Sequence, residues 1–179
     1  HGLSKYNFTA GSFSEDARGR WYFNIVVELP VVPLEENQTK AIGIDLGLKS
    51  AITTSNGLSI PAPQFYRKLQ GKLGKSQRAR NKKRVRSIHA KIKNSRKDWA
   101  NKSCSQLVKD KAAIFVRDVS PVALGKTKLA KSVYDVSWNQ IKTMLKSKAK
   151  AQSVWFEEVS EKYTTQTCSC CGKIPHSIS

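Results

Sequence analysis

The chain has 179 residues, 39% of them hydrophobic, so it is long enough and apolar enough to bury a core. Its 32 Lys and Arg residues outnumber its 13 Asp and Glu residues, which gives a formal net charge of +19. This excess favours a polyanionic partner, nucleic acid first and an anionic membrane surface second. No apolar run approaches the roughly 18–20 residues of a membrane span, and we expect no signal peptide.

The cysteines indicate the cellular compartment, and the first residue indicates whether the sequence is a fragment. Three of the four cysteines lie within residues 168–171, unlike the dispersed cysteines of a secreted disulfide scaffold. This favours a reducing, cytoplasmic compartment. Because the chain begins at His1 rather than Met, we expect a fragment, or a gene model that begins inside a longer protein.

The first third of the chain predicts strands. Residues 21–29 are aromatic and β-branched with no breaker. Three shorter apolar strands are expected over residues 41–47, 50–55 and 58–61. Asn56 and Gly57 separate the last two and are typical of a tight hairpin turn. We therefore expect three consecutive antiparallel strands.

The remainder predicts helices alternating with strands. Residues 67–112 indicate a long basic helix and then a second helix from about Asp98. Ser137 is a candidate cap for another helix. Further helices are expected over residues 127–135 and 138–151, and further strands over residues 112–119 and 153–159. The order of elements predicts an α/β fold.

Residues 67–97 carry most of the net charge. They hold 14 Lys and Arg and no acid, whereas the rest of the chain holds 18 basic and 13 acidic residues. Cations along a helix neutralise several phosphates at once, and the lack of interleaved aromatics argues against base stacking. The alternative, a solvated helix face, is less favoured because the cations repel one another. The predicted nucleic-acid contacts are Arg67, Lys68, Lys72, Lys75, Arg78, Arg80, Lys82, Lys83, Arg84, Arg86, Lys91, Lys93, Arg96 and Lys97.

Asp45 follows an apolar strand and precedes Gly47, which permits close approach of backbone or ligand. A carboxylate at a strand end suits Mg²⁺ or Mn²⁺, and phosphodiester hydrolysis often uses two such ions held by several carboxylates. One alternative is a turn-forming aspartate. Another is the phosphate loop of actin-like ATPases, but no second Asp-x-Gly motif follows Asp45.

Cys168 and Cys171 have the Cys-x-x-Cys spacing that binds Zn²⁺ from a tight turn. A structural zinc site needs four ligands, so the pair is half a site. His176 is a candidate third ligand and Cys170 a candidate substitute. A thioredoxin-type redox role is the alternative, and it is weak because no helix is predicted after the motif.

In this order, the segments GIDLGLKSAITTSNG, AAIFVRDVSP, KSVYDVSWNQIKTMLKSKA and YTTQTCSCCG closely resemble the OrfB/TnpB proteins of insertion sequences. These transposon proteins are related to type V CRISPR effector nucleases, and the resemblance covers about residues 20–172. It implies an RNase H-like (RuvC) core with a basic helical insertion and a partial zinc-ribbon knuckle. It also implies DNA and a guide RNA as partners, with no membrane and no small-molecule substrate.

The resemblance also assigns residues, segments and a setting. Asp45 matches the first catalytic acid, which would hold Mg²⁺ or Mn²⁺, and Cys168 and Cys171 match the first half of a Zn²⁺ ribbon. The setting would be prokaryotic, cytoplasmic and nucleoid-associated. The segments are the end of a β-rich, wedge-like domain with a linker (1–38), the first RuvC-like strands (39–66), the basic helical segment (67–112), the rest of the core (113–163) and the truncated knuckle (164–179).

The chain departs from the family pattern in three ways. Arg117 stands where the middle acid is usual, just before Asp118, so Glu161 and Glu158 become candidates for that acid. Their alternative is an exposed strand-end carboxylate. The second Cys-x-x-Cys and the terminal motif with the last catalytic Asp are missing. We therefore expect a truncated copy that binds nucleic acid without cleaving it. The rivals are a non-catalytic binding module and a non-functional pseudogene product.

Overall fold

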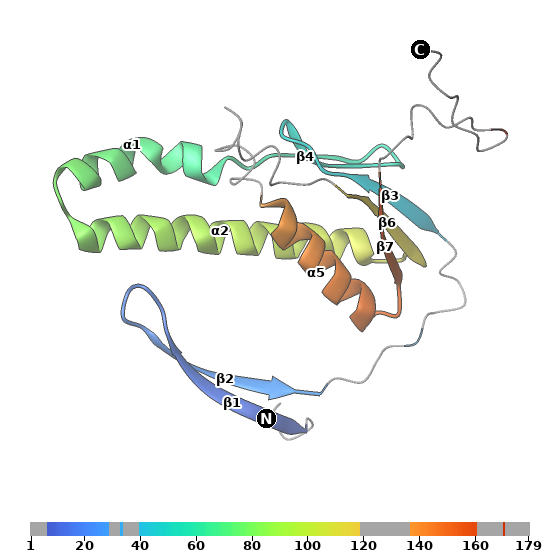
Figure 1. Cartoon of the computed structure of the whole chain (residues 1–179), viewed down its shortest axis with the longest axis horizontal. Coiled ribbons are helices and arrows are strands. Elements are labelled where there is room, and N and C mark those ends of the chain that lie inside the picture. The colour runs from blue at the N-terminus through green and yellow to red at the C-terminus, as the bar shows by residue number, and fades with distance from the viewer. Residues whose placement is uncertain (1–6, 29–32, 34–39, 119–136, 161–169, 171–179) are drawn as a thin grey trace, which may run out of the picture.

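The computed structural model describes residues 7–28, 33, 40–118, 137–160 and 170 (Figure 1). Those residues form two sheets and several long helices. The elements are β1 (Phe8–Glu15), β2 (Trp21–Val27), β3 (Ala41–Asp45), β4 (Ser50–Thr54), β5 (Ser59–Pro61), α1 (Phe65–Arg78), α2 (Lys82–Val108), β6 (Ala113–Arg117), α5 (Trp138–Ala151) and β7 (Trp155–Val159). The mixture confirms the predicted α/β class, while the five-segment division stays a prediction.

The main sheet has the strand order β5-β4-β3-β6-β7. Strands β3, β4 and β5 pair antiparallel in sequence, which confirms the predicted series. Gly57 in the last turn has a φ of +86°, a conformation that favours glycine. Strands β6 and β7 continue the sheet parallel to β3. The carboxyl ends of β3, β6 and β7 therefore meet at one edge.

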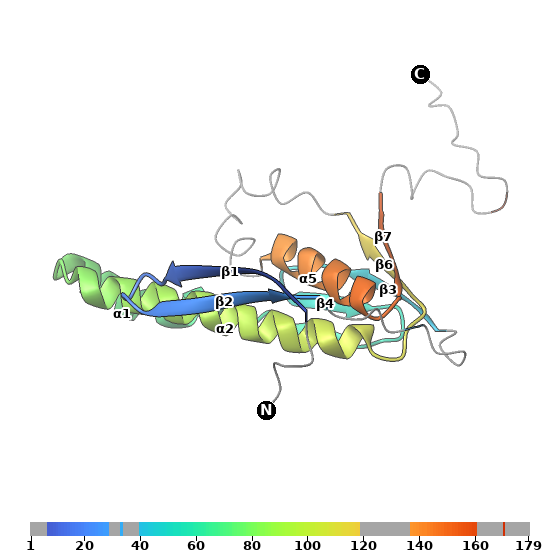
Figure 2. The same cartoon turned by 90° about the horizontal axis from the view of Figure 1, so that it is seen from below.

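One face of this sheet is covered by α5 and the C-terminal part of α2, which pack against each other (Figures 1 and 2). The core contains aliphatic side chains from both layers. Its largest fully buried members are Ile52, Leu107, Ile114, Ile141, Leu145, Val108, Val116 and Cys104. Removing this apolar surface from water is the main stabilising contribution to the fold.

Helices α1 and α2 form a long hairpin with its own small cluster of Leu73, Ile88 and Ile92. The predicted helix break near Asp98 is wrong, because the chain turns at residues 79–81. Arg80 there has a φ of +50°, and the side chain of Asn81 caps α2 by accepting from the Arg84 N–H at 2.9 Å. Asp98 instead lies inside α2.

The helix predicted over residues 138–151 has the boundaries of α5. Ser137 precedes it, but the expected side-chain cap is wrong. The residue has a φ of +56°, and its hydroxyl makes no capping hydrogen bond to the first turn. The helix predicted over residues 127–135 lies outside the described residues.

Strands β1 and β2 form a separate antiparallel ribbon. Strand β1 was not predicted, because FTAGSFSE lacks a clear alternation of apolar and polar residues. Phe13 and Phe23 pack across the two strands with ring centroids 4.9 Å apart. The ribbon turns at residues 16–19, where Gly19 has a φ of +80°.

Candidate nucleic-acid interface and the Asp45 edge

Asp45 and Arg117 end neighbouring parallel strands at the carboxyl edge of the sheet. Ile44 pairs with Val116, so the next residues, Asp45 and Arg117, share one face. The Nη1 atom of Arg117 donates to Oδ1 of Asp45 at 3.0 Å. The two side chains are 47% and 50% exposed, so solvent screens the pair and limits its contribution to stability to about 1 kcal/mol or less.

A second charged cluster joins α5 to the same edge. The Nζ atom of Lys142 donates to Asp118, at 2.9 Å, and to Glu158. The Lys142 side chain is only 12% exposed. Burial acts to lower the pKa of Lys142, but the hydrogen bonds and charges of Glu158 and Asp118 outweigh it and raise that pKa above 10.5.

These two clusters lie on opposite faces of the sheet. Glu158 pairs with Val116, whose partner on the other side is Ile44, so Glu158 is one row before Asp45. Successive side chains of a strand alternate between faces, which puts Glu158 on the helix-covered face with Lys142. The structure therefore brings Glu158 to Lys142 and not to Asp45. Of the other candidate ligands, Glu161, Cys168 and Cys171 lie outside the described residues.

The described residues do not fit the predicted Mg²⁺ or Mn²⁺ site. Among them, no group of three or more His, Cys, Asp or Glu side chains is placed to hold a metal ion. Asp45 supplies one carboxylate, and its contact across the strands is a guanidinium, which has no lone pair to donate to a metal. Hard divalent ions prefer several oxygen ligands.

The loop after Asp45 is held by backbone contacts. A Cβ atom on Gly47 would lie 2.8 Å from the carbonyl oxygen of Ser50, which is closer than packing allows. The indole Nε1 of Trp138 donates to the Gly47 carbonyl at 3.3 Å and ties α5 to this loop. The close approach predicted at Gly47 is therefore that of the chain's own backbone.

The predicted nucleic-acid contacts lie on the α1–α2 hairpin and its turn. All fourteen cations are exposed except Arg96, which is half-buried. The apolar side chains of the hairpin face inward and leave the charged ones outside. The first acid after this stretch is Asp98, and it already pairs with Lys102 at 2.8 Å. The hairpin is thus an extended basic surface.

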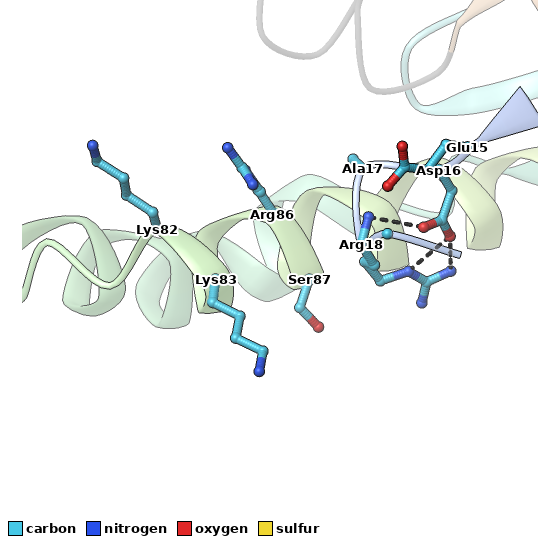
Figure 3. Close-up of a pocket in the computed structure, with 9 residues that line it drawn as sticks. Glu15, Asp16, Ala17, Arg18, Lys82, Lys83, Arg86 and Ser87 are labelled. Atoms are coloured by element: carbon cyan, nitrogen blue, oxygen red, sulfur yellow. Dashed lines mark hydrogen bonds and ion pairs between the residues drawn. The ribbon is translucent and has the colours of Figure 1, made fainter. Parts of the chain in front are cut away.

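The turn of the β1–β2 ribbon lies beside the first turns of α2 and encloses a cleft of about 960 Å³ (Figure 3). On the α2 side, Lys82 and Arg86 point to one side of the helix and Lys83 to the other (Figure 3). These cations spread along the helix instead of converging on one point. Such a surface suits an extended polyanion better than a small anion.

Asp16, the acid of this turn, already accepts hydrogen bonds from its neighbours. Asp16 accepts from the guanidinium of Arg18 at 2.9 Å and from the backbone N–H groups of Arg18 and Arg20. Partial burial acts to raise the pKa of Asp16, but these hydrogen bonds and the Arg18 charge lower it to about 2. Sequence reasoning missed this contribution of the ribbon, because its charges are mixed and carry no motif.

Two family models match the chain. OrfB_IS605, described as "Probable transposase", matches residues 24–126, which is more than half of the chain. Cas12f1-like, TNB domain, matches residues 138–178. The two matches lie in succession and cover the described helices and the main sheet between them.

Two similar curated proteins are both named as putative RNA-guided DNA endonucleases. The chain is 28% identical over 184 residues to a "Putative RNA-guided DNA endonuclease" of Streptomyces pristinaespiralis, covering 93% of this chain and 44% of that protein. It is 25% identical over 182 residues to the "Putative RNA-guided DNA endonuclease InsQ" of Escherichia coli K12, covering 86% of this chain and 45% of that protein. The chain thus spans less than half the length of these relatives.

A solved structure shares the fold. The match is to a cryo-EM structure of a Cas12f1–sgRNA–target DNA complex, with a TM-score of 0.63 and 16% identity. It covers 97% of this chain and 40% of that chain. At this identity the likeness shows the fold alone. Within the described residues, no helix has both the length and the apolar character needed to cross a bilayer.

Proposed function

The chain belongs to the OrfB_IS605 family of probable transposases, and from this premise we propose that it is the nucleic-acid-binding and nuclease-core part of an RNA-guided DNA endonuclease. The names of the curated relatives support this activity. We propose DNA and a guide RNA as its partners, in a cytoplasmic, nucleoid-associated, prokaryotic setting.

The strand arrangement supports an RNase H-like core. Strands β3, β4 and β5 are antiparallel neighbours. Strand β6 then pairs parallel with the other side of β3, and β7 pairs parallel with β6, which gives the order β5-β4-β3-β6-β7. Asp45 ends β3, the central strand, where the resemblance implies the first catalytic acid. Helices α2 and α5 cover one face of this sheet.

The observation that carries the proposal is the α1–α2 hairpin. Its exposed cations are spread over two long helices with no acid among them between residues 67 and 97. Each phosphate neutralised releases a condensed counterion, so such a surface binds a nucleic-acid backbone in a strongly salt-dependent way. The hairpin would track phosphates without reading bases.

The candidate metal ligands follow from the family resemblance. Asp45 is the candidate ligand for Mg²⁺ or Mn²⁺, with Glu161 as the candidate second acid, while Glu158 is held at Lys142. Cys168 and Cys171 are candidate Zn²⁺ ligands that would need further donors.

Binding is tested by fluorescence anisotropy of labelled RNA and DNA at increasing salt. We expect a steep loss of affinity for the wild type. Reversing Arg80, Lys83 and Arg84 to Glu should flatten the slope of log K against log[salt] by about 2–3. The matched control reverses Lys109, Lys146 and Lys150, which are exposed outside the hairpin, and should change the slope less. Equal effects of the two triple variants would refute the proposed surface.

A second candidate function is a non-catalytic binding module, which the Arg117–Asp45 ion pair favours. The test is incubation of labelled DNA or RNA with the chain and Mg²⁺ or Mn²⁺. Cleavage that Asp45→Ala abolishes supports the nuclease. Binding without any cleavage supports the module.

A further inference from the structure

Near the carboxyl edge of the parallel strands, three carboxylates are each paired with a side-chain cation. Asp45 is paired with Arg117 on the open face. Asp118 and Glu158 share Lys142 on the helix-covered face.

A fourth carboxylate, that of Glu157, lies one row before Glu158 on the open face, where it accepts from the Trp155 indole at 3.2 Å. A site for a hard divalent ion brings several oxygen ligands to one point. Among the described residues, this edge does not.

We propose that Arg117 takes the place of a metal ion at Asp45 and excludes divalent cations from this edge of the sheet. The inference rests on the proposed function only in taking Asp45 as the family's first catalytic acid. It goes beyond that function by naming the residue that decides whether the edge accepts a metal.

Geometry supports the exclusion. A divalent ion bound to a carboxylate oxygen lies about 2.0–2.6 Å from it. The Arg117 nitrogen stands 3.0 Å from the Oδ1 atom of Asp45, so an ion on that oxygen would lie against the guanidinium. Like charges repel and arginine offers no lone pair, so the ion must first displace Arg117.

The chemistry of arginine favours its pair with Asp45 over a metal ion. A guanidinium presents several N–H donors and no acceptor atom, so it binds the Asp45 carboxylate but cannot itself ligate an ion. The other two paired carboxylates do not compensate, because they lie with Lys142 on the opposite face. Replacing Arg117 by an acid would instead put two carboxylates side by side on neighbouring strands.

The experiment measures Mn²⁺ binding by electron paramagnetic resonance on the full chain, without nucleic acid. The variants are wild type, Arg117→Glu, Arg117→Gln and the double variant Arg117→Glu/Asp45→Asn. Lys146→Glu is the control, because it makes the same charge change at an exposed site on α5. Circular dichroism checks that each variant is folded.

We expect Arg117→Glu to bind Mn²⁺ at least about tenfold more tightly than wild type, and Asp45→Asn to abolish the gain. Lys146→Glu should show no comparable gain. Should Arg117→Glu not fold, Arg117→Gln must still bind Mn²⁺ more tightly than wild type. Asp45-dependent Mn²⁺ binding in the wild type, equal to that of Arg117→Glu, would overturn the proposal, as would a folded Arg117→Glu without any gain. Salt-dependent nucleic-acid binding in EDTA, measured separately, tests the proposed function itself.

Discussion

At the scale of single residues, burial changes what Cys104 can do chemically. Its side chain is fully enclosed between α2 and α5, and its Sγ donates to the carbonyl of Ile141 at 3.7 Å. Burial raises the pKa of Cys104 to about 11, with the charge of Lys148 acting in the opposite direction. The reactive thiolate is therefore scarce near neutral pH.

We predict that Cys104 resists iodoacetamide in the native protein at pH 8 and is alkylated once the chain is unfolded in guanidinium chloride. Peptide mass spectrometry measures the labelled fraction. Cys170 is exposed and is the reference within the same sample. Native labelling of Cys104 as fast as that of Cys170 would contradict the enclosed position.

Gly47 is a second residue-scale test, because the missing side chain is needed there. We predict that Gly47→Ala lowers the free energy of unfolding by about 1–3 kcal/mol, since the new Cβ would meet the Ser50 carbonyl at 2.8 Å. Urea denaturation measures it. Gly71 is the control, since it lies within α1 with nothing near its Cβ position. Gly71→Ala should be neutral or stabilising by up to about 1 kcal/mol. A Gly47→Ala variant as stable as wild type would rule out the close contact.

The residue scale also shows how far the site was predictable. Asp45 was identified from a carboxylate at the end of an apolar strand, and Arg117 from its departure from the family pattern. Their contact was not predictable, because it depends on the register of β3 against β6. Lys142 gave no signal, because in sequence it resembles Lys146, Lys148 and Lys150 of the same helix.

At the scale of elements, the position of the turn between α1 and α2 shows which local sequence signal starts a helix. Asp98 is a residue type common at helix starts, which favoured a break there. The helix instead starts after Asn81, which supplies the actual cap, and runs on through Asp98, whose carboxylate pairs with Lys102 one turn later. The strands of the main sheet and the helices that cover it were predicted from the sequence, whereas the position of the hairpin turn was not.

The attachment of α5 to β6 and β7 is tested by Lys142→Met, which leaves Asp118 and Glu158 without their shared cation. We predict a loss of about 1 kcal/mol near neutral pH. The pKa of Lys142 is raised on folding, so its contribution is complete below pH 10.5 and is lost as pH rises through the higher folded-state value. The difference in Tm between variant and wild type should therefore shrink as the pH rises above 10.5.

Lys146→Met is the matched control for this prediction, because Lys146 is exposed on the same helix. It should change Tm little at either pH. A Tm difference for Lys142→Met that stays constant from pH 8 to pH 11.5 would argue against an electrostatic role for Lys142.

At the scale of the whole molecule, the described residues differ in how they are stabilised. The main sheet and its helices share one buried core, whereas every residue of β1 is exposed. Alternating elements predicted the α/β class, but the order of strands depends on pairings between segments far apart in sequence. The pairing of β3 with β6 across the whole α1–α2 hairpin is one such contact.

We predict a corresponding hierarchy in amide hydrogen exchange. Amides of the β1–β2 ribbon should exchange faster than those of β3 and β6, because local opening of the ribbon exposes little buried surface. Exchange followed by mass spectrometry measures this, with α5, which packs on the core, as the protected reference. Equal protection of ribbon and sheet would indicate that the ribbon is covered by a further surface.

The two-part packing of α2 has a consequence for the length of the proposed nucleic-acid surface. With 27 residues, α2 is about 40 Å long, a little more than one turn of a DNA duplex. Its residues near Ile88 and Ile92 pack on α1, whereas those from Ala100 onward pack on the sheet. The outer part of α2 packs on α1 and not on the main core, so its length is independent of that core. Adding or removing whole turns at its tip would change the length of the proposed nucleic-acid surface and leave the sheet, with its Asp45 edge, unchanged.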